Sequence, residues 1–438
     1  MSPTPPTRRQ FLAASGALGL AGCLSQSLAT EPNTATYDRS VDRDRADWAK
    51  YDPDWTAPTD SPLAYEYETE VLVENLEIPW DLSFTGTDEL FLTERTGTIR
   101  RFESGDVVDV VSPDDAIDAG AIEPGDEQTW WVDGGEGGLL GVAAHPGFPD
   151  PPLVYAYYTY RDGDGRYNRV ASFDASAEAP NRTQETIVDD IPGTNVHNGG
   201  RIAFGPDGYL WITTGEANER ELAADRESLG GKVLRVTTTG DPAPGNPETG
   251  DRRVFAYGHR NPQCITWLPD TTPVVAEHGP AGKDEVNLVS AGRNSGWPEA
   301  RTPDEYRNSD VGRPVVNTGN ETWAPTGGVF YTGDSVPGLQ NRLLVGGLRS
   351  QQLVAVTLSR SGEDLPPAEN GRRFDADWMD DRYVATVHVL FENEFGRIRH
   401  VEQGPNGDLY FVTSNRDGRA REPFPTEGHD VLVRVTQA

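Results

Sequence analysis

The chain has 438 residues and carries 70 acidic against 38 basic side chains, a formal net charge of −32 at neutral pH. This balance excludes a nucleic-acid partner, because a polyphosphate needs a basic face to bind. Lysine occurs only as Lys50, Lys232 and Lys283, and such an acidic, lysine-poor surface stays soluble in concentrated salt, so we expect a halophilic source, with an acidic enzyme from ordinary salt as the alternative.

The N-terminus matches an export signal. Arg8 and Arg9 form a twin-arginine pattern, and the apolar run Leu12–Leu20 follows them. The run ends in a lipobox-like LAGC sequence at Cys23. Residues 1–23 are therefore predicted to be a twin-arginine lipoprotein signal, with a buried N-terminal helix as the alternative. The mature protein would lie on the outer face of the cell membrane, held only by a lipid at Cys23.

Residues 24–66 are polar and rich in Pro and Asp, which predicts a disordered tether. Once Cys23 is assigned to the lipobox, Cys264 has no partner for a disulfide or a cysteine-based metal site. Cys264 begins the apolar run 264–268. We therefore expect it to be a packed core thiol and not a nucleophile.

The body, residues 67–438, contains six β-type runs at nearly even spacing. They begin at positions 90, 153, 210, 273, 343 and 409, so successive starts lie 63, 57, 63, 70 and 66 residues apart. With 47 glycines and 34 prolines, this spacing predicts an all-β fold, a six-bladed β-propeller of four-stranded antiparallel blades. A pair of β-sandwiches is the alternative. Pairing of residues 71–73 with residues 431–433 would close the ring.

The third unit, residues 196–216, reads as a β-hairpin with His197 at one mouth and Glu216 at the same end of the returning strand. In a propeller, the mouths of the inner strands converge on the axis. The residues at those mouths would therefore form one site: Glu94, Glu136, His197, Glu216, Arg260, His278, Arg349 and Arg397.

Eight short phrases, in collinear order over about residues 76–418, carry a family resemblance. They are residues 78–81 (IPWD), 135–141 (GEGGLLG), the hairpin 196–216, 230–235 (GGKVLR), 257–263 (YGHRNPQ), 277–280 (EHGP), 331–334 (YTGD) and 396–399 (GRIR). Together they resemble the soluble glucose/sorbosone (aldose) dehydrogenases, six-bladed propellers whose cofactor is pyrroloquinoline quinone. The resemblance implies an oxidoreductase that converts the C1 hydroxyl of an aldose to a lactone and passes its electrons to a separate acceptor.

The resemblance assigns the catalytic base to His197, since an imidazole titrates near neutral pH. Glu216 would orient that ring. The family often has Asp there, so the longer Glu216 side chain is a departure. Arg260 and Asn261 would polarise the quinone oxygens.

The resemblance also implies how the cofactor is held. Guanidinium groups bind carboxylates bidentately, and Arg397 and Arg399 lie two apart on a predicted strand, so they share a face. They would bind the quinone carboxylates together with Arg349, where the family often has Lys. Glu136 would contact cofactor or sugar. Calcium would be held partly by backbone carbonyls, those of Gly279 and Pro280.

Two rival functions remain open at this point. A calcium-dependent propeller lactonase would need acids on the axis and no arginine trio, whereas Arg349, Arg397 and Arg399 are present. A non-catalytic cell-surface propeller would have no need of His197, Arg260 and Asn261.

Three further patterns have structural interpretations. The sequence 162–165 (DGDG) reads as a hairpin turn and not a calcium loop, since it lacks the later acid. His278 has no second His at helical spacing, so a satisfied loop histidine is preferred to a zinc ligand. The aspartates of residues 375–381 read as a solvated face.

Overall fold

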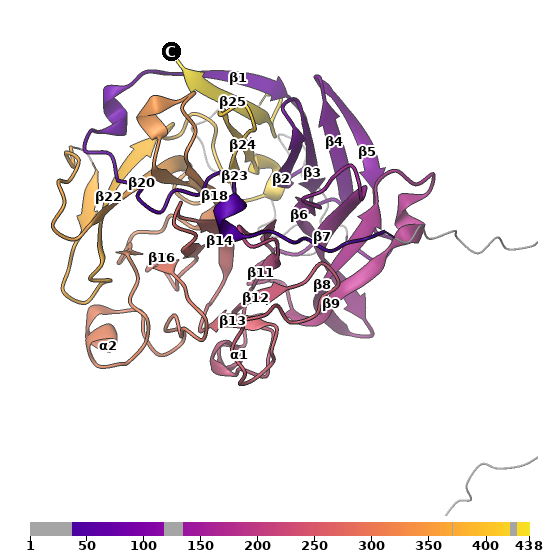
Figure 1. Ribbon diagram of the computed structural model, residues 1–438, viewed down its shortest axis with the longest axis horizontal. Helices are drawn as coiled ribbons and strands as arrows, with labels where there is room; N and C mark the ends of the chain where they lie inside the picture. The colour runs from indigo at the N-terminus through magenta and orange to yellow at the C-terminus, as the bar shows by residue number, and fades with distance from the viewer. Residues whose placement is uncertain (1–36, 118–134, 370, 421–426) are drawn as a thin grey trace, which may run out of the picture. The chain divides into compact units, whose positions relative to one another are not determined.

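The computed structural model describes residues 37–117, 135–369, 371–420 and 427–438. Six antiparallel sheets surround a common axis, which confirms the six-bladed propeller (Figure 1). Within the described residues, α-helix is limited to two short elements, α1 (Glu221–Ala224) and α2 (Pro303–Arg307). Short 3-10 turns are η1 (Arg45–Asp47), η2 (Pro62–Ala64), η3 (Pro180–Thr183), η4 (Pro337–Leu339) and η5 (Asn415–Asp417).

The blades follow one another along the chain. The first contains β2 (Pro79–Gly86), β3 (Glu89–Glu94), β4 (Thr98–Glu103) and β5 (Asp106–Val111), and the second β6 (Leu139–Ala144), β7 (Leu153–Asp162), β8 (Gly165–Asp174) and β9 (Glu185–Gly193). The third contains β10 (Ile202–Phe204), β11 (Leu210–Thr214), β12 (Lys232–Val236) and β13 (Val254–Tyr257), and the fourth β14 (Pro262–Trp267), β15 (Pro273–Glu277), β16 (Glu285–Leu288) and β17 (Val316–Asn317). The fifth contains β18 (Pro325–Tyr331), β19 (Arg342–Gly347), β20 (Gln352–Arg360), β22 (Tyr383–Leu390) and β21 (Arg372–Phe374), and the sixth β23 (Ile398–Gln403), β24 (Leu409–Thr413), β25 (Leu432–Gln437) and β1 (Tyr67–Val73).

The six evenly spaced runs are the second strands of the six blades, β3, β7, β11, β15, β19 and β24. Most of their residues are buried, because each such strand has a neighbour on both sides and a blade against each face. The first strands pack around the axis, β2 against β6, β6 against β10, and so on to β23 against β2. This ring places the beginnings of all six inner strands at one end of the axis.

One predicted detail of the blades is wrong: the fifth has five strands and not four. The chain after the long strand β20 folds back, and β21 pairs along the outer edge of β22, with Phe374 opposite Ala385. The ring closure is confirmed. β1 pairs with β25 and places Val71 opposite Val433, so the two ends of the body share the sixth blade.

The predicted tether is wrong for its described part, residues 37–66. Trp55 is 3% exposed and packs edge-on against Phe330, with ring centroids 5.1 Å apart. The hydroxyl of Tyr37 donates to Asp174 at 2.6 Å. Figure 1 shows this indigo segment crossing the ring of blades. Sparse aromatic anchors therefore hold a segment whose average composition is polar.

This crossing segment covers the end of the axis opposite the inner-strand beginnings. Trp48 and Lys50 line a second cavity of about 300 Å³ with residues from the later halves of the inner strands, such as Trp267 on β14 and Glu402 on β23. The propeller is thus closed on one face by its own N-terminal segment.

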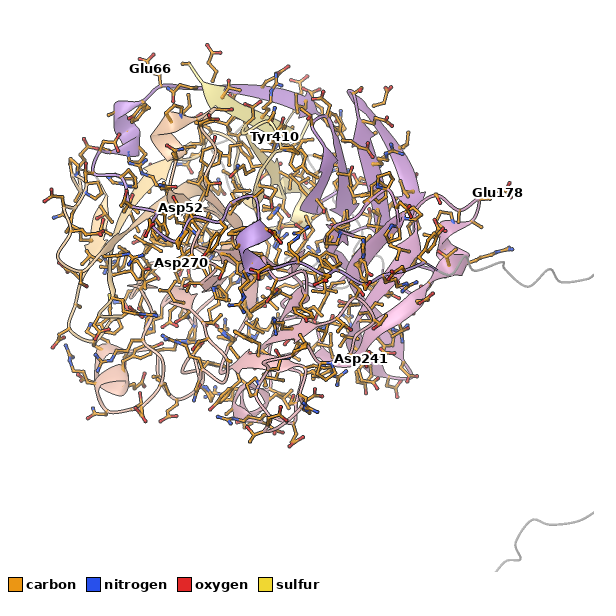
Figure 2. The ribbon with its side chains drawn as sticks, in the orientation of Figure 1. Asp52, Glu66, Glu178, Asp241, Asp270 and Tyr410 are labelled. Atoms are coloured by element: carbon orange, nitrogen blue, oxygen red, sulfur yellow. The ribbon has the colours of Figure 1, made fainter. Side chains whose placement is uncertain are left out.

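The predicted signal residues Arg8, Arg9 and Cys23 lie outside the described residues. Within the described residues, no helix is long and apolar enough to cross a membrane. Acidic side chains such as Glu66, Glu178 and Asp241 lie exposed at the periphery, as Figure 2 shows.

Two structural interpretations from the sequence are confirmed. Cys264 is fully buried in a hydrophobic cluster. Asp162 and Gly165 pair across the turn that joins β7 to β8, so this DGDG sequence is a hairpin turn. The solvated acidic face is confirmed for Asp375, Asp377 and Asp381, which are exposed, and not for Asp380, whose side chain is 5% exposed and pairs with Arg382 at 2.7 Å.

Candidate active site

A cavity of about 510 Å³ lies at the end of the axis where the inner strands begin. All six blades contribute to its lining, as the convergence of strand mouths predicts. Seven of the ten predicted site residues line it: Glu136, His197, Arg260, Gly279, Arg349, Arg397 and Arg399. The other three, Glu216, Asn261 and Pro280, do not line the cavity.

The lining carries a marked excess of positive charge. Among the described residues it contains six arginines, Arg95, Arg260, Arg349, Arg397, Arg399 and Arg419, against three carboxylates, Glu136, Asp284 and Asp417. The protein as a whole carries a net charge of −32, so the sign inside the cavity is the reverse of the sign outside. A cavity of this kind favours an anionic ligand.

Arg399 shows how this excess charge is held. Its side chain is almost completely buried; Nη1 donates to Gln263 Oε1 at 3.2 Å, and Nε has no hydrogen-bond partner among the described residues. Burial, reinforced by the charges of Arg397 and Arg95, holds the pKa of Arg399 well below its usual range, although Asp417 opposes this. A buried cation with unmet donors is stabilised by an anion in the cavity.

Arg397 is more fully paired. Its Nη2 lies 2.7 Å from Asp417 Oδ2, and its Nη1 donates to the carbonyl of Leu348 at 3.1 Å. These contacts fix the guanidinium on the cavity wall, next to Arg399 on β23.

His197 and Glu216 form a close pair at the edge of the cavity. His197 Nδ1 and Glu216 Oε1 are 2.5 Å apart, and the two side chains are 13% and 3% exposed. The Glu216 carboxylate accepts a hydrogen bond from the Nδ1–H of His197. A neutral His197 ring therefore has its lone pair on Nε2. The longer Glu side chain therefore reaches the imidazole despite the departure from Asp.

The backbone of His197 is held by the Glu136 carboxylate, which is itself paired with Arg419. His197 has a positive φ of 56°, and its N–H donates to Glu136 Oε2 at 3.0 Å. The other oxygen of Glu136 lies 3.0 Å from Arg419 Nη1. Burial alone would raise the pKa of Glu136, but the charge of Arg419 and the hydrogen bond from the His197 N–H lower it to about 2. Glu136 is therefore an ionised anchor for the His197 turn.

Arg260 is positioned by its own backbone. Its N–H donates to the buried Glu277 carboxylate at 2.7 Å, and its carbonyl accepts from the Glu216 N–H at 2.9 Å. Its guanidinium donates to the carbonyls of His278 at 3.3 Å and Gly279 at 3.2 Å. The third and fourth blades are thereby joined directly behind the site.

His278 corrects the prediction of a satisfied loop histidine. It lines the cavity, and its Nε2 is buried with no hydrogen-bond partner among the described residues. Burial is the main cause that lowers the pKa of His278, to about 3, and repulsion from Arg260 and Arg399 adds to it, while the attraction of Glu136 opposes it. The ring is therefore neutral at ordinary pH.

The sequence interpretation missed Arg95, Arg419, Asp284 and Asp417. It placed Glu94 at the first mouth, but the Glu94 carboxylate accepts from the backbone of the same blade and does not line the cavity. Arg95 lines the cavity and donates to the carbonyl of Gly137 at 2.9 Å. The side chains of adjacent residues in a strand point to opposite faces of the sheet. This alternation was the signal that would have distinguished Arg95, which lines the cavity, from Glu94, which does not.

Gly215 provides a test of how tightly His197 is placed. A Cβ at Gly215 would overlap the carbonyl oxygen of His197. We expect Gly215→Ala to displace the His197 turn and to lower kcat by up to about 100-fold, since small misplacements of a reacting group are that costly. Gly86→Ala is the matched control, because its Cβ would make only an ordinary contact of 3.7 Å with Glu89. Equal kcat for the two variants would show that the His197 backbone is not tightly held.

Comparisons with known proteins agree with this geometry. The family model for glucose/sorbosone dehydrogenase matches residues 76–422. The Escherichia coli aldose sugar dehydrogenase YliI is 28% identical over 393 residues, which cover 85% of this chain and 95% of that protein.

Two solved structures have the same fold at comparable identity. One is a putative oxidoreductase (glucose dehydrogenase) from Thermus thermophilus, 36% identical with a TM-score of 0.66, covering 84% of this chain and all of that one. The other is the aldose sugar dehydrogenase of Streptomyces coelicolor in its PQQ-bound form, 30% identical with a TM-score of 0.66, covering 87% of this chain and 99% of that one.

Proposed function

The chain belongs to the glucose/sorbosone dehydrogenase family, and from this premise we propose that it oxidises the C1 hydroxyl of aldose sugars to lactones with pyrroloquinoline quinone as the oxidant. One observation carries the proposal: a cavity with six arginines in its lining has a His–Glu pair at its edge. The cations suit an anionic cofactor, and the pair suits proton removal from a hydroxyl group.

The residues present fit the cofactor. Pyrroloquinoline quinone has three carboxylates, and the lining has three more arginines than carboxylates. Arg399 on β23 and Arg397, directly before that strand, would bind these carboxylates with Arg349, which lies two residues after β19. The unpartnered Nε of Arg399 supports this assignment, because a ligand carboxylate satisfies a buried guanidinium.

When bound, the quinone supplies the acceptor for the hydride that leaves the sugar carbon. His197 Nε2 removes the proton of the C1 hydroxyl, so the sugar loses one proton and one hydride and becomes a lactone. Glu216 holds the base in the tautomer with its proton on Nδ1 and stabilises the imidazolium that forms. Arg260 lies in the lining, where its guanidinium can donate to a developing oxyanion.

Calcium is a finer part of the proposal, at the carbonyls of Gly279 and Pro280, where it would polarise a ligand oxygen. The Gly279 carbonyl accepts a hydrogen bond from Arg260, and the positive charge of that guanidinium opposes Ca²⁺ binding at the same oxygen. We therefore expect Ca²⁺ to bind at least about tenfold more tightly when the quinone is present, because the quinone carboxylates offset the charge of the arginines. Calorimetric titrations with and without quinone measure the ratio, and equal affinities would contradict this coupling.

The proposed activity has a direct test. Purified protein in high salt is given quinone and Ca²⁺, and reduction of an artificial dye is followed with a panel of aldoses. We expect quinone binding by absorbance and aldose-dependent dye reduction. If the quinone does not bind and no aldose is oxidised, the proposal fails. Hydrolysis of a sugar lactone would then favour the lactonase, and loss of every activity would favour a non-catalytic propeller.

We also propose export by the twin-arginine route, lipidation at Cys23 and adaptation to high salt. The supporting observations are the Arg8-Arg9 pair, the LAGC sequence and the charge of −32. Expression of the full chain and of Cys23→Ser in a host with this export route tests the anchor. The unchanged chain should partition with membranes, whereas the variant should be released. Release of both proteins would contradict the anchor. The same proposal includes a separate physiological acceptor for the electrons taken from the sugar.

A further inference from the structure

We propose that His278 is a ligand-binding residue of the cavity, held by Asn261 as a neutral imidazole whose Nε2–H donates to an acceptor oxygen of the bound ligand. The donor role follows from hydrogen bonds within the protein. Only the identity of the ligand, a carboxylate or carbonyl oxygen of the quinone, rests on the proposed function.

His278 is fixed at the cavity by its backbone. It directly follows β15, and its N–H donates to the carbonyl of Asn261 at 3.2 Å. Its own carbonyl accepts from Arg260 at 3.3 Å. The imidazole lines the cavity, and its buried Nε2 has no partner among the described residues.

The orientation of the Asn261 amide is determined by a second contact. Asn261 is fully buried, and its Oδ1 accepts the N–H of Gly199 at 3.0 Å. The opposite orientation would place an amide NH₂ against that N–H, two donors face to face. Nδ2 of Asn261 therefore faces Nδ1 of His278, at 3.4 Å.

This contact fixes the tautomer of His278. The Asn261 NH₂ group can only donate, so Nδ1 of His278 must accept and cannot carry a proton. The proton of the neutral ring is then on Nε2, which is buried and has no hydrogen-bond partner among the described residues.

A buried N–H without an acceptor is unfavourable, so a ligand oxygen at this point is stabilised. Carboxylate and quinone carbonyl oxygens are acceptors only, which matches a donor in a cationic cavity. Asn261 contacts both histidine segments, because Gly199 lies two residues after His197. Asn261 is thus a positioning residue for the two imidazoles of the site, and this replaces the predicted contact between Asn261 and the quinone.

The tautomer is tested first on the protein without quinone. Histidine labelled with ¹⁵N gives a long-range ¹H–¹⁵N spectrum in which the His278 signals are identified by their absence in His278→Gln. We expect the pattern of an Nε2–H ring in the unchanged protein. In Asn261→Asp the new carboxylate accepts, so the proton should move to Nδ1. An Nδ1–H pattern in the unchanged protein, or the same pattern in both proteins, would overturn the proposal.

The ligand contact is tested by quinone titration followed by absorbance. We expect His278→Ala to raise the quinone Kd by about tenfold or more, with partial recovery in His278→Gln, whose amide also donates. His388→Gln, outside the cavity on β22, is the control and should leave Kd unchanged. If the unchanged protein binds quinone and His278→Ala binds it equally well, the inference is wrong. If the unchanged protein binds no quinone, the proposed function fails and the spectrum still decides the tautomer.

Discussion

Replacement of His197 by Ala is expected to lower kcat by about 10²–10⁴-fold, the contribution of a positioned general base. The base is lost, whereas the arginines that would bind the quinone remain in place. The quinone Kd should therefore change little. Single-turnover dye reduction and quinone titration on the same preparation measure the two quantities. Retention of turnover in His197→Ala would show that another group removes the proton.

Glu216→Gln is the companion variant for this experiment. The amide keeps the length of the side chain but loses the charge that stabilises the His197 imidazolium. We expect a smaller fall in kcat than for His197→Ala. The double variant should be no slower than His197→Ala alone, because the carboxylate acts through the imidazole. A further fall in the double variant would place Glu216 in a role of its own.

Replacement of Arg301 by Leu is expected to lower the free energy of unfolding by about 3–5 kcal/mol, the usual cost of leaving a buried charge without its partner. Arg301 is 4% exposed and lies 3.2 Å from Glu277 and 2.8 Å from Glu285, both fully buried. Glu277 also accepts the backbone N–H of Arg260, so the loss should extend to the active site. Urea unfolding at constant salt measures the free energy.

Arg307→Leu is the control for Arg301→Leu. Arg307 pairs with Asp377 at 2.6 Å, but both side chains are exposed to solvent, and such exposed pairs add little to the free energy of unfolding. Burial already raises the pKa of Glu285 to about 7 against the attraction of Arg301, whereas the charge of Arg301 helps to hold the pKa of Glu277 low despite burial, so both pKa values rise when Arg301 is lost. A raised carboxyl pKa gives stability that is present at low pH and lost as the pH rises. The deficit of Arg301→Leu should therefore grow with pH. Equal deficits for the two variants would show that the buried cluster contributes little.

The propeller was predictable because its signal lies in single strands. Each second strand is a short apolar run, and their even spacing is visible without knowledge of the contacts. β21 gave no such signal, since residues 372–374 include two exposed arginines and pair only at a sheet edge. The segment 37–66 was misjudged because composition averages over its anchors. Burial of one tryptophan, Trp55, in an apolar pocket holds the segment against the propeller although most of its neighbours in sequence are polar.

The candidate site was predictable where a residue stands at a strand mouth, as with His197, Arg260 and Arg397. It was not predictable where position depends on an irregular loop, as with Arg419. Asn261 was identified for a different reason than the one its contacts support. The Gly199 N–H fixes the orientation of the Asn261 amide, and that orientation determines which nitrogen of His278 carries the proton. No sequence pattern encodes this choice.

The shared sixth blade has a consequence for the order in which the chain can fold. β1 is among the first elements to leave the ribosome, and its partner β25 is the last. The edge of β1 must remain unpaired until β25 has been synthesised, and an unpaired edge invites association with other chains. The ring therefore closes only after β25 has left the ribosome, and nascent chains that stop short of residue 432 should remain open and prone to aggregate.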